Sequence, residues 1–85
     1  MNNIKMLVTP EQSIKVQKIC FSLSIFWPMN QNELMETKHK ALFIEDRTLY
    51  YSNINFEEYT NFKTVDADNF IKTKGFTIKK LLRRK

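Results

Sequence analysis

A change of hydrophobic period near the N-terminus constrains the fold of this chain more than any other feature. Apolar Ile4, Met6 and Val8 alternate with Lys5 and Leu7, which predicts a short strand with one buried face. From residue 10 onward the apolar spacing becomes that of a helix. A strand followed directly by an amphipathic helix indicates a domain of mixed α and β structure.

The junction between the two periods contains a helix-start signal. Thr9 suits the N-cap position, Pro10 the first helical position, and Gln12 completes a Thr-x-x-Gln capping box. We expect a helix from about Pro10 to about Leu23. Its predicted apolar stripe is Val16, Ile19, Cys20 and Leu23, and its predicted water-facing residues are Gln12, Lys15 and Lys18.

The remaining elements are predicted from shorter signals. The apolar run 22–27 ends at Pro28 and favours a strand, and residues 29–38 favour a loop. Residues 41–44 and 48–51 read as a hairpin around an acidic turn, and residues 64–65 as a brief edge strand. Asp66 can cap a short helix from Ala67 to about Thr73. Phe70 and Ile71 are expected to pack this helix on the core, and Gly75 is expected to end it.

Together these elements predict an α+β fold in one small domain. It would contain a short antiparallel sheet packed by an N-terminal helix, a short second helix and a basic C-terminal segment. A length of 85 residues suits a single core, and 42% hydrophobic residues are enough to fill it. We expect a compact body over residues 1–75, with residues 76–85 as a basic segment of the same domain.

Charge is divided unevenly along the chain. Residues 1–71 contain seven basic and all nine acidic residues, whereas residues 72–85 contain seven basic residues and no acid. Such a segment attracts phosphates through counterion release. We therefore expect RNA- or partner-binding by the cations of this segment: Lys72, Lys74, Lys79, Lys80, Arg83, Arg84 and Lys85. A merely solubilising terminus is the alternative, and a membrane-surface helix is disfavoured because Leu81 and Leu82 bury little apolar area.

No residue pattern predicts catalysis, a metal site or a cofactor. The single histidine, His39, lies between two lysines in a polar stretch, where a solvated loop position is expected. Cys20 lies on the apolar helix stripe and is expected in the core. The acidic pairs at 45–46 and 57–58 are expected to be solvated charge rather than metal ligands. We therefore expect a protein that is not an enzyme.

The sequence does not indicate a standard RNA-binding module. Tyr50 and Tyr51 are of the type that stacks on RNA bases, but successive strand residues face opposite ways, so at most one exposed ring is expected. No sequence motif of a standard RNA-binding module is present.

The apolar stretch 19–27 is too short to span a bilayer, so we expect a soluble cytosolic protein without a membrane partner.

A series of short motifs resembles small accessory proteins of T4-like bacteriophages. The motifs are Val8-Thr9-Pro10-Glu11-Gln12-Ser13, Val16-Gln17, Phe21, Trp27, Leu42-Phe43-Ile44-Glu45-Asp46, Leu49-Tyr50 and Ala67-Asp68-Asn69-Phe70-Ile71. The resemblance implies a small α+β protein in the cytoplasm of an infected bacterium that binds and redirects or inhibits a host factor. Within that group, counter-defence proteins neutralise host toxins, including RNA-cleaving toxins of toxin–antitoxin systems, and a basic tail would suit a target that holds RNA.

Two functional hypotheses follow. In the first, a non-enzymatic phage accessory protein binds RNA through its basic C-terminal region while its body docks on a host protein, with a toxin endoribonuclease as the candidate target. In the second, the chain is a protein-only inhibitor whose cations contact an acidic patch on a host protein, without RNA. The sequence leaves homo-oligomerisation open under both hypotheses.

Overall fold

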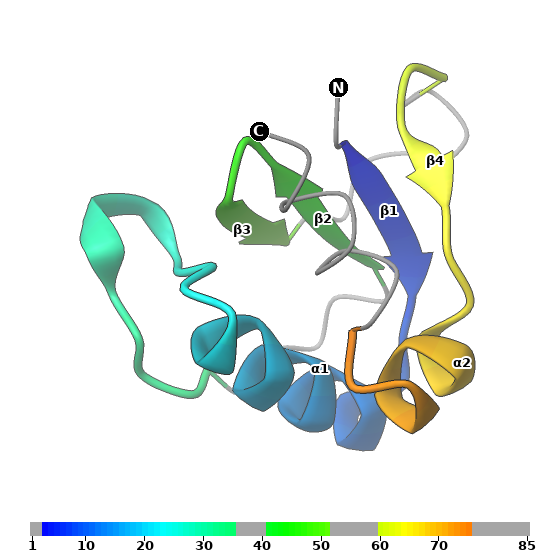
Figure 1. Cartoon of the computed structure of the whole chain (residues 1–85), viewed down its shortest axis with the longest axis horizontal. Coiled ribbons are helices and arrows are strands. Elements are labelled where there is room, and N and C mark those ends of the chain that lie inside the picture. The colour runs from blue at the N-terminus through cyan, green and yellow to red at the C-terminus, as the bar shows by residue number, and fades with distance from the viewer. Residues whose placement is uncertain (1–2, 36–40, 52–59, 76–85) are drawn as a thin grey trace.

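The computed structural model describes residues 3–35, 41–51 and 60–75. Within these residues a four-stranded sheet, in the order β3-β2-β1-β4, has two helices on one face (Figure 1). The elements are β1 Ile4–Leu7, α1 Pro10–Ser22, the 3-10 turn η1 Pro28–Asn30, β2 Ala41–Glu45, β3 Thr48–Tyr51, β4 Lys63–Thr64 and α2 Ala67–Lys72. The expected α+β fold is confirmed.

The sheet is mixed rather than antiparallel throughout. Strands β1, β2 and β3 pair in antiparallel fashion, as expected, but β4 pairs with β1 in parallel, with Ile4 opposite Lys63 and Lys5 opposite Thr64. A parallel neighbour cannot follow through a tight turn, so no local turn signal marks this pairing in the sequence. The expected edge strand exists, one residue earlier than predicted.

The β2–β3 hairpin has the predicted tight turn. Both central residues are left-handed, with φ of 49° at Asp46 and 63° at Arg47. Two left-handed central residues define the type I′ turn, whose twist matches that of the flanking strands. The hairpin sets the register that places Leu49 opposite Ile44.

Helix α1 begins with the predicted capping box. The Gln12 backbone N–H donates to Thr9 Oγ1 over 3.2 Å, and the Thr9 N–H donates to Gln12 Oε1 over 2.9 Å. These two bonds satisfy amides that would otherwise have no partner at the helix start.

The end of α1 replaces the strand expected at residues 22–27. Ser24 is left-handed, with φ of 62°, its N–H donates to the Phe21 carbonyl, and the Ile25 N–H donates to the Cys20 carbonyl over 2.8 Å. This pair of bonds is a Schellman motif, which turns the chain away from the helix. In the described residues 25–31, strand-type pairing is limited to two isolated bridges, one between Phe26 and Thr48 and one between Trp27 and Gln31.

The core lies between the two helices and the sheet. Its buried cluster is Ile4, Met6, Val8, Val16, Cys20, Ile25, Trp27, Leu42, Ile44, Leu49, Ala67 and Phe70. Trp27 is 3% exposed, which confirms that the lone tryptophan is a core residue. Most strand residues in this cluster alternate in sequence, as expected for one face of a sheet.

The second face of the sheet is also buried at its centre, which corrects the one-sided strand predicted for β1. Lys5 is 6% exposed and Phe43, opposite it on β2, is 3% exposed. The Phe43 ring packs edge-on against Phe62 with 5.8 Å between centroids. The second face of the β1–β2 pair is therefore buried around Lys5 and Phe43, whereas Leu7, on the same face of β1 as Lys5, is 58% exposed.

Candidate binding surface at the α1–α2 junction

The described part of the predicted binding segment lies at the C-terminal end of α2. Lys72 is the last residue of the helix, Lys74 follows two residues later, and both are exposed. The other five predicted binding residues lie outside the described residues: Lys79, Lys80, Arg83, Arg84 and Lys85. The structure thus locates where the cationic segment 72–85 begins.

A second Schellman motif positions Lys74. The N–H of Lys74 donates to the Ile71 carbonyl over 3.1 Å, and the N–H of Gly75 donates to the Phe70 carbonyl over 2.8 Å. Lys74 occupies the left-handed position of this motif, with φ of 53°. Glycine is preferred there because it has no Cβ to clash, so a lysine is an unusual occupant.

Gly75 allows α2 to end in close contact with α1. A Cβ added at Gly75 would lie 2.9 Å from Leu23 Cδ1 and 3.0 Å from Ile19 Cγ2. Those separations are shorter than normal packing contacts, so a larger residue would require the Leu23 and Ile19 side chains, or the chain at residue 75, to shift. The predicted stop at Gly75 is therefore a site of close approach as well as the end of the helix motif, and it keeps Lys74 beside α1.

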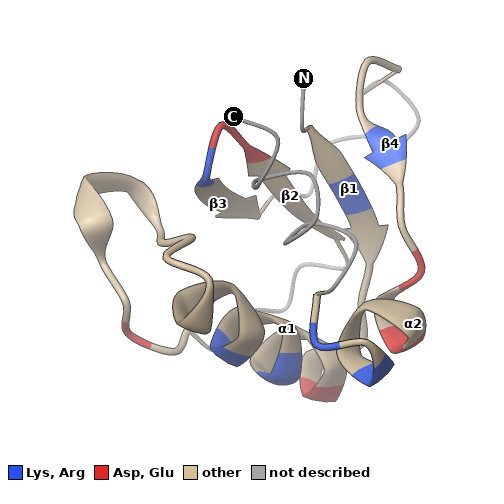
Figure 2. Cartoon of the chain, in the orientation of Figure 1, with Lys and Arg blue, Asp and Glu red and all other residues tan. Residues whose placement is uncertain are grey.

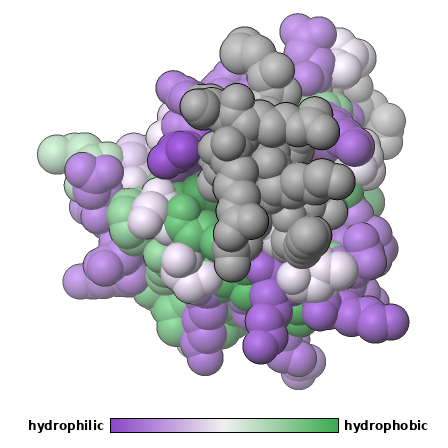
Figure 3. Space-filling model, viewed as in Figure 1, coloured by the Kyte–Doolittle hydropathy of each residue, from purple (hydrophilic) through white to green (hydrophobic). Residues whose placement is uncertain are grey.

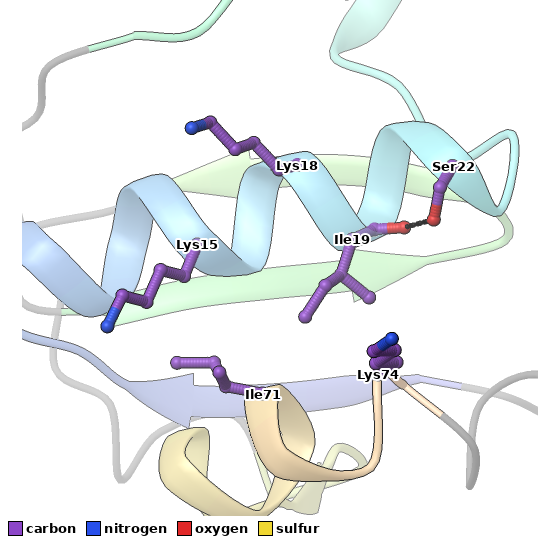
Figure 4. Close-up of a pocket in the computed structure, with 6 residues that line it drawn as sticks. All are labelled: Lys15, Lys18, Ile19, Ser22, Ile71 and Lys74. Atoms are coloured by element: carbon purple, nitrogen blue, oxygen red, sulfur yellow. Dashed lines mark hydrogen bonds between the residues drawn. The ribbon is translucent and has the colours of Figure 1, made fainter.

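An open groove of about 350 Å³ runs between the two helices. It is lined by Lys15, Lys18, Ile19 and Ser22 of α1 and by Ile71 and Lys74 from the α2 end (Figure 4). The isoleucines point toward the gap between the helices, with Lys15 and Lys74 beside them, whereas the Lys18 ammonium points away from α2. The groove thus has an aliphatic floor and a cationic rim.

The described lining of the groove contains three lysines, and Glu11 lies one helical turn before Lys15 on α1. None of the described lining residues is acidic. The nearest acids along the two helices, Glu11 and Asp68, lie in their first turns, and Asp68 accepts a hydrogen bond from the Gln12 side chain over 2.6 Å. Figure 2 shows lysines of both helices on the same side of the molecule, and Figure 3 shows hydrophobic and hydrophilic side chains alternating there.

Sequence reasoning did not place Lys15 and Lys18 in the binding surface. It predicted correctly that both face water on α1, and both are exposed. What it lacked was the packing of α2 against α1, which brings Lys74 to the groove that Lys15 and Lys18 line. The three-residue spacing of Lys15 and Lys18 could have indicated that the two lysines lie on one face of the helix.

A second groove, of about 320 Å³, lies between β3 and the turn after Trp27. Its lining includes Met29, Leu49, Tyr50 and Tyr51. Tyr50 and Tyr51 are 41% and 40% exposed, so the expectation of at most one exposed ring is wrong. Both rings reach water because β3 is an edge strand, and Tyr51 lies beside Trp27 with 5.5 Å between ring centroids.

The other candidate chemical groups show no site among the described residues. Cys20 is buried, as expected, and burial raises the pKa of its thiol to about 12. Glu45 and Asp46 are exposed at the hairpin, whereas His39 and the acidic pair 57–58 lie outside the described residues. Over the described ranges no group of three or more His, Cys, Asp or Glu side chains could hold a metal ion.

In the same part of the chain, no helix is long and apolar enough to cross a membrane. Comparisons of the whole chain with protein families, with curated proteins and with solved structures found no match. The surface at the α1–α2 junction and the charge of segment 72–85 are therefore the features of this protein that bear on its function.

Proposed function

We propose that this chain is a non-enzymatic accessory protein that binds RNA through its C-terminal cations and docks its folded body on a host protein. The resemblance to small phage proteins supports a place for it in the cytoplasm of an infected bacterium, with an RNA-cleaving toxin as the candidate host target. No reaction is part of this proposal.

The observation that carries RNA binding is the charge around the end of α2. Lys72 and Lys74 are exposed at the start of a fourteen-residue segment with seven cations and no acid. Lys15 and Lys18 on α1 extend this positive surface onto the folded body. Lysine ammonium groups bind phosphates as point charges and release condensed counterions, so this mode of binding needs no base-specific contacts.

The salt dependence of RNA binding tests this proposal. Each phosphate contact to a single strand contributes a slope of about −0.7 in log affinity against log salt. Replacing Lys79, Lys80, Arg83, Arg84 and Lys85 by Gln should flatten the slope measured by fluorescence anisotropy with a labelled oligouridylate. The thermal midpoint should stay close to that of the wild type, because surface substitutions usually change stability by less than about 0.5 kcal/mol.

A matched control is available on the opposite edge of the sheet from the β2–β3 hairpin. Lys63 is exposed on β4 and is not among the described residues that line the α1–α2 groove, so Lys63→Gln removes one charge without touching the proposed surface. This variant should bind RNA like the wild type. If the five-residue variant kept the affinity and salt slope of the wild type, the C-terminal cations would not be the RNA-binding element.

Docking on a host protein without RNA is the second candidate function. The aliphatic floor of the α1–α2 groove favours it, because phosphates need charge alone whereas Ile19 and Ile71 offer apolar surface. Growth of bacteria that express an RNA-cleaving toxin separates the two candidates. Under the RNA hypothesis the five-residue variant should fail to restore growth. If the α1–α2 groove docks the host protein without RNA, the same variant, which keeps the groove residues, should still restore it.

A further inference from the structure

We propose that the groove between α1 and α2 docks a segment of a partner protein that carries both acidic and aliphatic side chains. The inference rests on the proposed function, because it assigns the surface through which the folded body would contact a host protein. It concerns the described lining residues of the groove and does not depend on the C-terminal cations beyond Lys74.

The floor of the groove is suited to an aliphatic side chain. Ile19 and Ile71 pack against the hydrophobic core but remain partly exposed, and they point toward the same gap from two helices (Figure 4). An apolar side chain inserted there would complete their burial, which is the favourable term in groove recognition.

The rim of the groove selects for negative charge. Lys15 and Lys74 lie beside the two isoleucines, and Lys18 is one turn along the outer side of α1. The Ser22 hydroxyl already donates to the Ile19 carbonyl over 2.6 Å, so the lysines are the described lining side chains with donors to offer. Carboxylates that flank an apolar residue would complement this rim, whereas lysines on a partner would be repelled.

The lining favours a protein segment over RNA as the occupant. Bases of single-stranded RNA bind proteins largely by stacking on aromatic rings. The described residues of this groove include no aromatic side chain. RNA could use the cations but would leave the aliphatic floor unused, whereas an acidic segment with leucine or isoleucine uses both.

The turn that ends α2 fixes the backbone position from which the Lys74 side chain leaves the chain. Lys74 holds the left-handed position of the Schellman motif, with φ of 53°, and a side chain there strains the backbone relative to glycine. Five other described non-glycine residues also have positive φ, among them Ser24 in the equivalent position after α1. Lys74 therefore supports the proposal through its charge beside the aliphatic groove and not through its backbone conformation.

Titration of protein with ¹³C-labelled isoleucine methyl groups tests the assignment. The probe is a designed acidic helical peptide with glutamates flanking a leucine stripe. Two control peptides have the leucines replaced by glutamine or the glutamates replaced by lysine. We expect the first peptide to shift the Ile19 and Ile71 methyl signals, with little change at the core residues Ile4, Ile25 and Ile44.

Charge reversal supplies the matched variants. Changing Lys15, Lys18 and Lys74 together to Glu should weaken binding of the acidic peptide by at least about tenfold, because attraction becomes repulsion at Lys15 and Lys74 and the charge of Lys18 on the outer side of α1 is reversed as well. Lys63→Glu on β4 makes the same kind of change away from the groove and should leave the affinity unchanged. Ile71→Ser should also weaken binding while all three lysines are kept.

Three outcomes would overturn the inference. Equal binding of the peptide that lacks leucines would mean that the groove responds to charge alone. Shifts of the Ile19 and Ile71 signals with oligouridylate, but not with the acidic peptide, would make RNA the occupant. Self-association of the protein that the charge-reversed variant abolishes would make a second copy the occupant.

The inference and the proposed RNA binding can fail separately. The variant with five C-terminal cations changed to Gln keeps Lys15, Lys18 and Lys74, so it should bind the acidic peptide normally while binding RNA weakly. Loss of peptide binding in that variant would contradict the groove assignment. Unchanged RNA binding in it would contradict the RNA proposal and leave the result for the peptide unaffected.

Discussion

Gln12 is hydrogen-bonded to Asp68, over 2.6 Å between Gln12 Nε2 and Asp68 Oδ1, and this bond joins the first turns of the two helices. The same Gln12 side chain accepts the Thr9 N–H through Oε1 over 2.9 Å. One amide group therefore caps α1 and ties α2 to it. The groove lined by Lys15 and Lys74 lies between the two helices that this bond connects.

Gln12→Glu should separate these two roles. A carboxylate keeps the capping box but loses the donor toward Asp68 and places two negative charges together. We expect the free energy of unfolding to fall by about 0.5–1.5 kcal/mol in chemical denaturation. The double variant Gln12→Glu with Asp68→Asn restores a donor–acceptor pair and should recover most of the loss. A double variant no more stable than Gln12→Glu alone would show that the bond contributes nothing.

Gln17 should be essential for the position of residues 33–35. Its buried amide donates to the Met35 carbonyl and accepts the Met35 N–H, each over 2.8 Å. Gln17→Ala leaves these backbone groups without partners and should lower stability by about 1–3 kcal/mol. It should also move Trp27 emission to longer wavelength, because the Trp27 indole N–H donates to the Glu33 carbonyl in the same segment. Gln31→Ala, at an exposed position, should change neither quantity.

Lys74→Gly should make the protein more stable but weaken its binding to the acidic peptide. Glycine relieves the left-handed backbone at this position, so the free energy of unfolding should rise by up to about 1 kcal/mol. The acidic peptide should nevertheless bind more weakly, because the groove has lost a cation. Lys72→Gly is the matched control, since it removes the same side chain from a helical position, where glycine should cost about 0.5–1 kcal/mol. If both variants lost stability equally, Lys74 would not be strained.

Cys20 should make the protein less stable in alkali. Burial raises the pKa of its thiol from 9.0 to about 12, so the unfolded chain releases the thiol proton at lower pH than the folded chain. The stabilisation is complete below pH 9.0 and is lost as the pH rises toward about 12, at up to about 1.4 kcal/mol per pH unit. Denaturation curves across this range should show the decline in the wild type. Cys20→Ala should be less stable than the wild type at every pH, but its free energy of unfolding should fall less between pH 9.0 and about 12, because it lacks the thiol. If the two proteins showed the same pH dependence, the thiol would be exposed to water.

Features that depend on interactions within a few residues could be predicted from the sequence. The capping box of Thr9 and Gln12, the cap that Asp66 makes to the Asn69 N–H and the tight turn of the β2–β3 hairpin all appear as predicted. Each depends on a side chain or a backbone angle that satisfies neighbouring amides, so the physics is local. The buried positions of Val16, Cys20 and Trp27 were predicted correctly. Ile19 and Leu23 of the predicted α1 stripe are only partly buried, whereas Ser13 and Gln17 are buried without having been predicted.

Other features were decided only when the elements packed together. The chain turns at Ser24 instead of forming a strand because Ile25 reaches the core through a Schellman motif, and an apolar run by itself does not distinguish these outcomes. Lys5 is buried because the second face of the sheet is covered around Lys5 and Phe43, which strand periodicity cannot reveal. Likewise, Lys15 joins Lys74 only because Gly75 permits α2 to end against α1. The sequence by itself determined most of the elements and the cationic end of the chain. Contacts across more than fifty residues decided which lysines share a surface, because such contacts depend on the relative positions of whole helices.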